Sequence, residues 1–320
     1  MKKRDCSLDI GQGLMMLHMI SFHLRGYALV DFKIGLLEDF MFFFFMPWFF
    51  FKAGIFWKQN TLSDVIKQGY KRLLRPFIIF SILGHVLYCI RLIIEGDYYW
   101  AHYVLSPFKS LLRYGCVTGN DPLWFLLTLF LVRVVYTTLK KYHVSTIYIV
   151  SFCAFWGFLC NQLSIVTEPR YMGNFFTGLL FYSTGHFWTN FEGKILPPPY
   201  KKYLVASIMI FTILVYFVYP SAVDLFYNKT LYGNYFIWII HSILCIITLN
   251  NLLKRVPDFQ VLRSIGEYSM TYYVFHRLII FGVQNVFIYL NLPSVGVPVF
   301  IWSSIMCIIF LPIITKYYKL

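Results

Sequence analysis

Apolar stretches long enough to cross a bilayer occupy most of this chain. A membrane-spanning helix needs about 20 mostly apolar residues, and about ten stretches meet that criterion. They lie near 8–28, 36–57, 74–94, 122–139, 146–163, 173–190, 203–219, 232–253, 268–289 and 297–316. Charged residues make up only 13% of the 320 residues, so the chain lacks the polar surface of a soluble enzyme or a disordered protein. The sequence predicts an all-α, polytopic membrane protein with a single domain over residues 1–320.

The net charge of +14 is explained first by membrane topology. Most of the 28 Lys and Arg residues fall on one predicted side, in six groups. These groups are Lys2–Arg4, Lys58–Arg75, Lys140–Lys141, Lys194–Lys202, Lys254–Arg263 and Lys316–Lys319. Because cytoplasmic loops are enriched in Lys and Arg, we expect both termini in the cytoplasm, which requires an even number of spans. The charge then indicates orientation and contact with membrane lipid, and no nucleic-acid partner is expected.

No metal site or disulfide framework is predicted. The seven cysteines form no Cys-x-x-Cys pair, and most lie in apolar stretches where they pack as small hydrophobic residues. His18 and His23 are five residues apart, so they point about 140° apart around a helix and cannot share a metal.

Polar residues inside spans are costly and therefore mark candidate functional positions. His23 lies fourteen residues after Asp9 on the first span, about 21 Å further across the bilayer at ~1.5 Å per residue. It is a candidate catalytic residue because a neutral imidazole can act as general base and then as acid. The alternative is a histidine that is hydrogen-bonded within the helix bundle.

Glu38 and Asp39 open the second predicted span near the end of the first span that carries His23. A carboxylate there could fix the tautomer of the His23 ring, as in other His–carboxylate pairs. The alternative is a pair of solvated loop carboxylates.

The densest basic run, Lys67–Pro76, stands at the cytoplasmic mouth of the third span. On an α-helix, Arg72 and Arg75 share a face, and two guanidinium groups there can bind phosphates with Lys71 beside them. The alternative is topological charge in contact with lipid headgroups.

Three further positions are candidates for substrate binding. Tyr273 and His276 belong to a polar stripe in the ninth span, and Trp124 stands at the outer mouth of the fourth. Each could bind a sugar or a developing oxyanion. Trp124 is otherwise an aromatic-belt residue of the membrane interface.

Five motifs in this order resemble the membrane-bound acyltransferase-3 family, and the likeness covers most of the chain. The motifs are Asp9-Ile-Gly and then His23, Met46–Gly54, Arg72-Leu-Leu-Arg75-Pro76, Leu123–Leu126, and Ser269 with Tyr273 and His276. The branch of the family that the chain resembles most is the fucose O-acetylase-like group.

The resemblance implies an acyl-CoA donor on the cytoplasmic side, usually acetyl-CoA, and a sugar hydroxyl of an exported or cell-surface glycan as acceptor. It makes His23 the catalytic residue and places Arg72 and Arg75 at the CoA phosphates. His23 would act either as a general base or as an acyl carrier. The implied location is the plasma membrane, as in the bacterial inner membrane. The rival functions are a transporter or flippase of a polar or lipid-linked solute, and a lipid-linked glycan polymerase.

One position departs from the family pattern. Many members carry Arg or Lys eleven residues before the histidine, where this chain has the neutral Gln12. A basic residue of Lys2–Arg4 could substitute, or the donor could differ from acetyl-CoA. Lys52 is a further charge inside a predicted span, and the resemblance assigns it no role.

Overall fold

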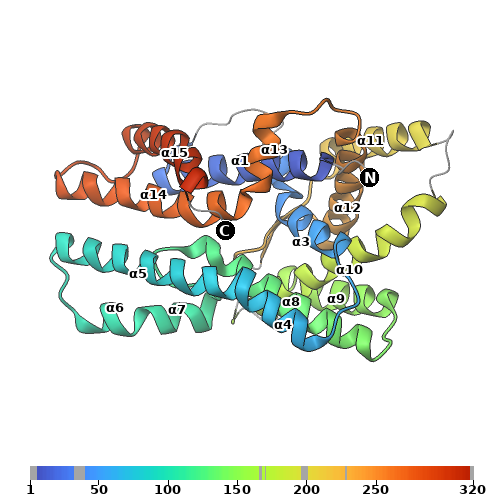
Figure 1. The fold of residues 1–320 in the computed structure, drawn as a ribbon, viewed down its shortest axis with the longest axis horizontal. Coiled ribbons are helices and arrows are strands. Elements are labelled where there is room, and N and C mark those ends of the chain that lie inside the picture. Colours follow the sequence, from blue (N-terminus) through green and yellow to red (C-terminus); the bar gives the residue numbers. More distant parts are fainter. Residues whose placement is uncertain are drawn as a thin grey trace.

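The computed structural model describes residues 6–31, 40–165, 168–169, 171–195, 201–227 and 229–317, and the structural statements below concern those residues. The chain forms a bundle of helices that run past one another (Figure 1). The first half contains α1 (Ser7–Ala28), α3 (Phe45–Ile55), α4 (Leu62–Gly69), the π-helical turn η1 (Tyr70–Leu74), α5 (Arg75–Glu95), α6 (Trp100–Val104), α7 (Ser106–Tyr114), the 3-10 turn η2 (Asp121–Leu123), α8 (Trp124–Lys141) and α9 (Thr146–Asn161). The second half contains α10 (Tyr171–Ile195), α11 (Lys201–Val218), β1 (Ala222–Asp224), β2 (Lys229–Tyr232), α12 (Tyr235–Leu253), α13 (Gln260–Glu267), α14 (Ser269–Tyr289) and α15 (Val297–Tyr317).

A helix lies in each of the ten ranges that the sequence predicts as spans. Four helical segments are long and apolar enough to cross a membrane by themselves: Leu62–Glu95, Asp121–Lys141, Tyr235–Leu253 and Val297–Tyr317. Two shorter apolar helices cover Thr146–Asn161 and Val205–Val218. The chain is therefore an integral membrane protein.

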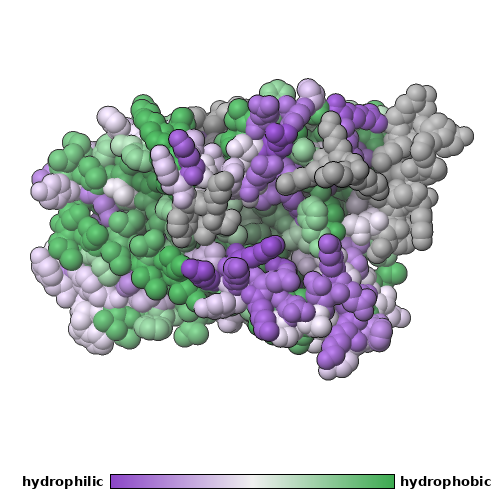
Figure 2. All heavy atoms as spheres, in the orientation of Figure 1, coloured by the Kyte–Doolittle hydropathy of each residue, from purple (hydrophilic) through white to green (hydrophobic). Residues whose placement is uncertain are grey.

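The surface of α5 shows which side of a helix faces lipid. Ile78, Ile82, Val86, Ile90 and Ile93 recur every three or four residues, and all five side chains are exposed. In water such a stripe would be unfavourable, whereas hydrocarbon accepts it. Figure 2 shows hydrophobic residues covering α5, α14 and α15 at the left, while hydrophilic residues gather over α4 at the lower right.

Glycines set the spacing of the central helices. At Gly54 on α3, a methyl group would collide with the backbone oxygen of Tyr182 on α10, and at Gly185 it would meet that of Phe51. The α1–α13 pair repeats this arrangement, with Gly13 against the backbone of Leu262. Small residues that let backbones approach closely are typical of helix interfaces in membranes.

Two parts of the fold differ from the expected loops. The segment 95–121 contains the short helices α6 and α7, and both are too short to be predicted from the length of about 20 residues that a membrane span needs. A small antiparallel hairpin, β1–β2, precedes α12 and is the one departure from an all-α architecture in the described chain. The Asn234 side chain caps the helix that follows by accepting hydrogen bonds from the backbone N–H groups of Phe236 and Ile237.

The turn before α8 is fixed by close contacts with two other helices. The Asn120 side-chain amide donates hydrogen bonds to the backbone oxygens of Phe80 on α5 (3.4 Å) and Val274 on α14 (3.3 Å). Gly119 has a φ of 101°, and a Cβ there would collide with the backbone oxygen of Gly84. These contacts hold η2, and with it Asp121 and Trp124, against the core.

Candidate functional site

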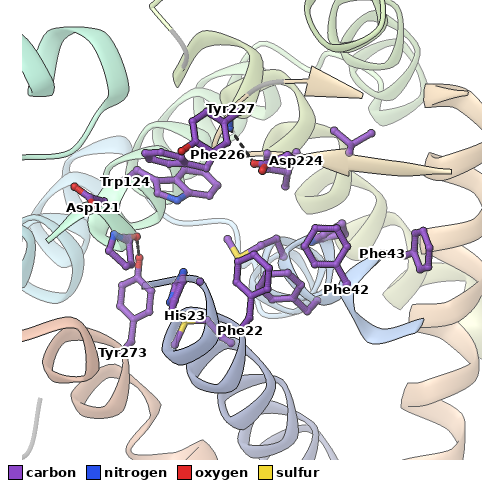
Figure 3. Close-up of a pocket in the computed structure, with 18 of the residues that line it drawn as sticks. Phe22, His23, Phe42, Phe43, Asp121, Trp124, Asp224, Phe226, Tyr227 and Tyr273 are labelled. Carbon is purple, nitrogen blue, oxygen red and sulfur yellow. Dashed lines mark hydrogen bonds between the residues drawn. The ribbon is translucent and has the colours of Figure 1, made fainter. Parts of the chain in front are cut away.

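A cavity of about 360 Å³ opens at the end of α1 that carries His23 (Figure 3). Its walls come from α1, α3, η2, α8, α12, α14, the segment before α3 and the β1–β2 hairpin. The lining residues are Met19, Phe22, His23, Gly26, Tyr27, Phe42, Phe43, Phe45, Met46, Pro47, Asp121, Pro122, Trp124, Val223, Asp224, Leu225, Phe226, Tyr227, Trp238 and Tyr273. Predominantly apolar walls with a few convergent polar groups are typical of binding sites for small molecules.

His23 and His276 form a hydrogen-bonded pair between α1 and α14. Nδ1 of His23 lies 2.8 Å from Nε2 of His276, and the two rings are nearly parallel, with an interplanar angle of 9°. Nδ1 of His276 lies 2.7 Å from the backbone oxygen of Tyr273. A carbonyl oxygen can only accept, so the Nδ1–H of His276 is the donor in that bond.

The second bond then has a fixed direction. In a neutral His276 ring, Nε2 carries no proton and accepts, so Nδ1–H of His23 is the donor. Nε2 of His23 keeps its lone pair and is the basic atom of the pair. His276 was expected among the substrate-binding residues, whereas in the structure it contacts His23 and is not among the described residues that line the cavity.

Tyr273 and Trp124, the other two candidates for substrate binding, line the cavity. The Tyr273 hydroxyl, however, donates a hydrogen bond to the backbone oxygen of Pro122, so it links α14 to η2. Within the described residues, the Trp124 side chain makes no hydrogen bond, and its ring contacts Phe226 of the hairpin at a centroid distance of 6.4 Å.

Two lining carboxylates were not predicted as site residues. Asp121 stands directly before the Pro-Leu-Trp segment, and its place in that motif was the only available signal. Asp224 comes from the hairpin, where its Oδ1 accepts the backbone N–H of Tyr227 at 3.0 Å. Nothing in the local sequence distinguishes Asp224 from an ordinary turn aspartate.

The side chain of Lys52, a buried cation, contacts Gln12, the neutral residue at the position where many family members are basic. Its ammonium donates hydrogen bonds to the side-chain oxygen of Gln12 and to the backbone oxygen of Leu8 at 3.0 Å. The same ammonium is 3.8 Å from the Asp9 carboxylate. Gln12 in turn donates to the Ser269 hydroxyl. A positive charge therefore stands beside the neutral residue of α1, although it comes from α3; Lys2–Arg4 lie outside the described residues.

A second, smaller cavity of about 70 Å³ lies between Gln12 and the main cavity. Gln12, Ser269 and Met270 are among its lining residues. Met19, Met46 and Tyr273 line both cavities, so the two adjoin along α1.

The predicted phosphate-binding residues stand apart from this site. Lys71 and Arg72 belong to the π-helical turn η1, and Arg75 begins α5; all three side chains are exposed. They form no hydrogen bond or ion pair within the described parts of the chain. A π-helical turn also widens the angle between Arg72 and Arg75 relative to the shared α-helical face that the spacing predicts.

The remaining predicted positions give a mixed outcome. Glu38 and Asp39 lie outside the described residues, so the expected carboxylate partner of His23 stays a prediction. Within the described ranges, no cluster of three or more His, Cys, Asp or Glu residues could hold a metal ion.

Residues 6–316 match the model of an acyltransferase domain, that of the acyltransferase-3 family. Neither a curated protein nor a solved structure matches the chain. The match extends from the first turn of α1 almost to the end of α15, and so includes His23, Lys52, both arginines and the cavity. The chain belongs to the acyltransferase-3 family.

Proposed function

We propose that this membrane acyltransferase moves an acetyl group from acetyl-CoA to a hydroxyl of a sugar in an exported or cell-surface glycan. The observation that carries the proposal is the state of His23. Its ring lines the cavity, and its Nδ1–H is held by His276, which leaves Nε2 as a base. Family membership favours this activity over the transporter alternative.

The reaction requires His23 to accept one proton and then to release it. Nε2 of His23 takes the proton of the acceptor hydroxyl as the oxygen forms a bond with the thioester carbonyl carbon. When the carbon–sulfur bond breaks, the same proton passes from Nε2 to the departing sulfur. His276 keeps the ring oriented and stabilises the charged imidazolium by accepting from Nδ1–H. A route through an acyl-imidazole on His23 uses the same contacts.

Two observations support a donor that enters from the opposite end of α1. The smaller cavity adjoins the main one and reaches Gln12, so the pair suits a narrow pantetheine arm. Lys71, Arg72 and Arg75 are exposed and free to bind the phosphates of CoA. Trp124 is suited to a developing oxyanion or to the sugar because its indole N–H has no acceptor among the described residues.

The proposed topology follows from the same arrangement. About ten spans with both termini in the cytoplasm would put the arginines on the cytoplasmic side and His23 near the outer side. Donor and acceptor would then meet across the bundle of a plasma membrane, which we take to be a bacterial inner membrane.

The decisive experiment is transfer of labelled acetyl from acetyl-CoA to cell-surface glycan, with wild type compared with His23→Ala. We expect transfer to fall by ~10²–10⁴-fold, the range for loss of a general base. His18→Ala is the matched control, because His18 lies on the same helix, is buried and does not line the cavity. Full transfer by a well-folded His23→Ala protein would refute the mechanism.

A further inference from the structure

We propose that the hairpin end of the cavity selects an uncharged sugar and rejects sugars that carry a carboxylate. This inference rests on the proposed function, since it names the class of acceptor that the same site would take. The residues that carry it are Trp124, Phe226, Asp121 and Asp224, three of which the sequence analysis did not select.

The first observation is an aromatic wall opposite the catalytic base. Figure 3 shows Trp124, Phe226 and Tyr227 on one side of the cavity and His23 on the other. The Trp124 and Phe226 ring planes are inclined at 50°, so they form an open angle and not a closed stack. Such a surface is large, rigid and apolar, and it suits the C–H face of a pyranose ring.

The second observation is a set of polar groups with unused capacity. Trp124, Tyr27 and Asp121 are among the residues that line the cavity. Neither the Trp124 indole N–H, the Tyr27 hydroxyl nor the Asp121 carboxylate makes a hydrogen bond to another described side chain. A sugar hydroxyl both donates and accepts, so it can pair with each of these groups. An apolar ligand would leave them unsatisfied, which costs free energy in a buried site.

The third observation is the sign of the charge. Among the residues that the structure describes, the cavity lining includes Asp121 and Asp224 and no lysine or arginine. Arg277 stands behind Tyr27: its guanidinium lies 3.6 Å from the Tyr27 ring centroid, donates to Gln284 and does not line the cavity. A uronic acid would therefore bring a third carboxylate into a cavity whose described lining side chains include no Lys or Arg.

The hairpin delivers two of these groups together. Asp224 ends β1, and the hydrogen bond from the Tyr227 backbone N–H to Asp224 closes the turn that contains Phe226. The aromatic surface of Phe226 and the negative charge of Asp224 thus come from one short turn. A substitution in this turn would change which sugar binds and leave the His23 side chain in place. Asp224 is the specificity-determining residue in this arrangement.

Binding of matched sugar pairs to the purified full-length protein tests the proposal. The methyl glycosides of glucose, galactose and mannose would be compared with the corresponding methyl uronides, which differ only at C6, by calorimetric titration. We expect each bound neutral glycoside to exceed its uronide by about tenfold in affinity, the size of one poorly screened like-charge contact. Equal or tighter binding of the uronides, or binding of none of the six sugars, would overturn the proposal.

Substitutions locate the effect. Asp224→Asn should reduce the neutral-over-uronide ratio at least threefold, and Phe226→Ala should weaken the neutral glycosides themselves. Asp258→Asn, which removes an exposed carboxylate paired with Arg263, should change neither. A ratio unchanged in a folded Asp224→Asn protein would remove that residue from the proposal.

Acetyl transfer to the same sugars, measured in parallel, separates this inference from the proposed function. Selective binding without His23-dependent transfer would contradict the acyltransfer proposal and leave the binding preference intact. Transfer without charge selectivity would do the reverse.

Discussion

The two ends of the proposed reaction path are built differently. At one end, His23 is held by His276, which is itself held by the Tyr273 backbone; His276 and Tyr273 are buried, and His23 is half-buried where it lines the cavity. At the other end, Arg72 lies in the π-helical turn η1 and Arg75 begins α5; both side chains are exposed and make no hydrogen bond or ion pair within the described residues. The first region is held by hydrogen bonds within the protein itself, whereas the two arginine side chains have no such partners among the described residues.

This difference matches the role that we propose for each region. A proton transfer requires a fixed tautomer and a fixed direction, which buried hydrogen bonds supply. Recognition of phosphate requires charge and reach, and exposed arginines keep both without a desolvation cost in the free protein. Substitutions should therefore act on turnover at the buried end and on donor affinity at the exposed end.

The largest expected effect is on turnover in His276→Ala. Without an acceptor for Nδ1–H, the His23 ring can rotate, or it can adopt the other tautomer, in which Nε2 carries the proton and is no longer a base. We therefore expect kcat to fall by ~10²–10³-fold, with KM for acetyl-CoA little changed. His276→Gln should recover part of the loss, because its amide oxygen can accept from His23. The pH dependence of kcat should change in His276→Ala and return towards wild type in His276→Gln, an effect that a purely structural role would not produce.

His241→Ala is the control for removing a buried histidine. His241 is buried on α12, and its Nε2 lies 3.0 Å from the backbone oxygen of Thr212. It is not among the described residues that line the cavity. If the kcat of His241→Ala falls as far as that of His276→Ala at equal expression, the proposed role of His276 in holding His23 is excluded.

Lys52 belongs to neither region; it contacts the first turns of α1 and is expected to act on stability. Its side chain is only 11% exposed, and Asp9 beside it is 14% exposed. Lys52→Met leaves that carboxylate without the ammonium and should lower the free energy of unfolding by about 2–4 kcal/mol. The double variant Lys52→Met/Asp9→Asn should regain part of the loss, because it removes both charges.

Thermal unfolding of the detergent-solubilised protein measures this effect, with Lys67→Met on the exposed face of α4 as the matched control. An unfolding temperature of Lys52→Met equal to that of the control would show that the buried ion pair contributes nothing.

At the exposed end, Arg72→Ala/Arg75→Ala should raise KM for acetyl-CoA by about ten- to a hundredfold, since two charged hydrogen-bonding groups are lost. kcat at saturating donor should stay within twofold, in contrast to His276→Ala. Lys141→Ala is the control, because it removes an exposed basic residue at the end of α8. An equal effect in Lys141→Ala would return the arginine pair to the topological explanation.

The sequence predicted the helices better than it predicted the contacts between them. Hydrophobic length located a helix in each expected span, because the bilayer imposes that length on any chain. Residue type marked His23 and Trp124, since polar and amphipathic residues inside apolar runs are few. Both line the cavity in the structure.

Partners far apart in the chain could not be predicted in the same way. The spacing of residues along the sequence does not predict the contact between Lys52 and Gln12, because that contact depends on how α3 crosses α1. The same holds for His276 against His23, 253 residues away, and for Asp224, which an irregular hairpin brings to the cavity. Charge and depth are local properties of a sequence, whereas helix crossing is set by packing over the whole bundle.

The smallest effect tests that packing directly. Gly54→Ala should lower the free energy of unfolding by about 1–3 kcal/mol, because the added methyl group meets the rigid backbone of Tyr182. Gly282→Ala, on α14 with no atom within 4 Å of the added methyl group, should instead raise it by up to ~1 kcal/mol through helix propensity. Opposite signs for the same substitution, read by thermal unfolding, would show that the α3–α10 contact restrains α3. Since α3 carries both Lys52 and the Met46 wall shared by the two cavities, loosening it should impair the buried end and leave donor affinity at the arginines unchanged.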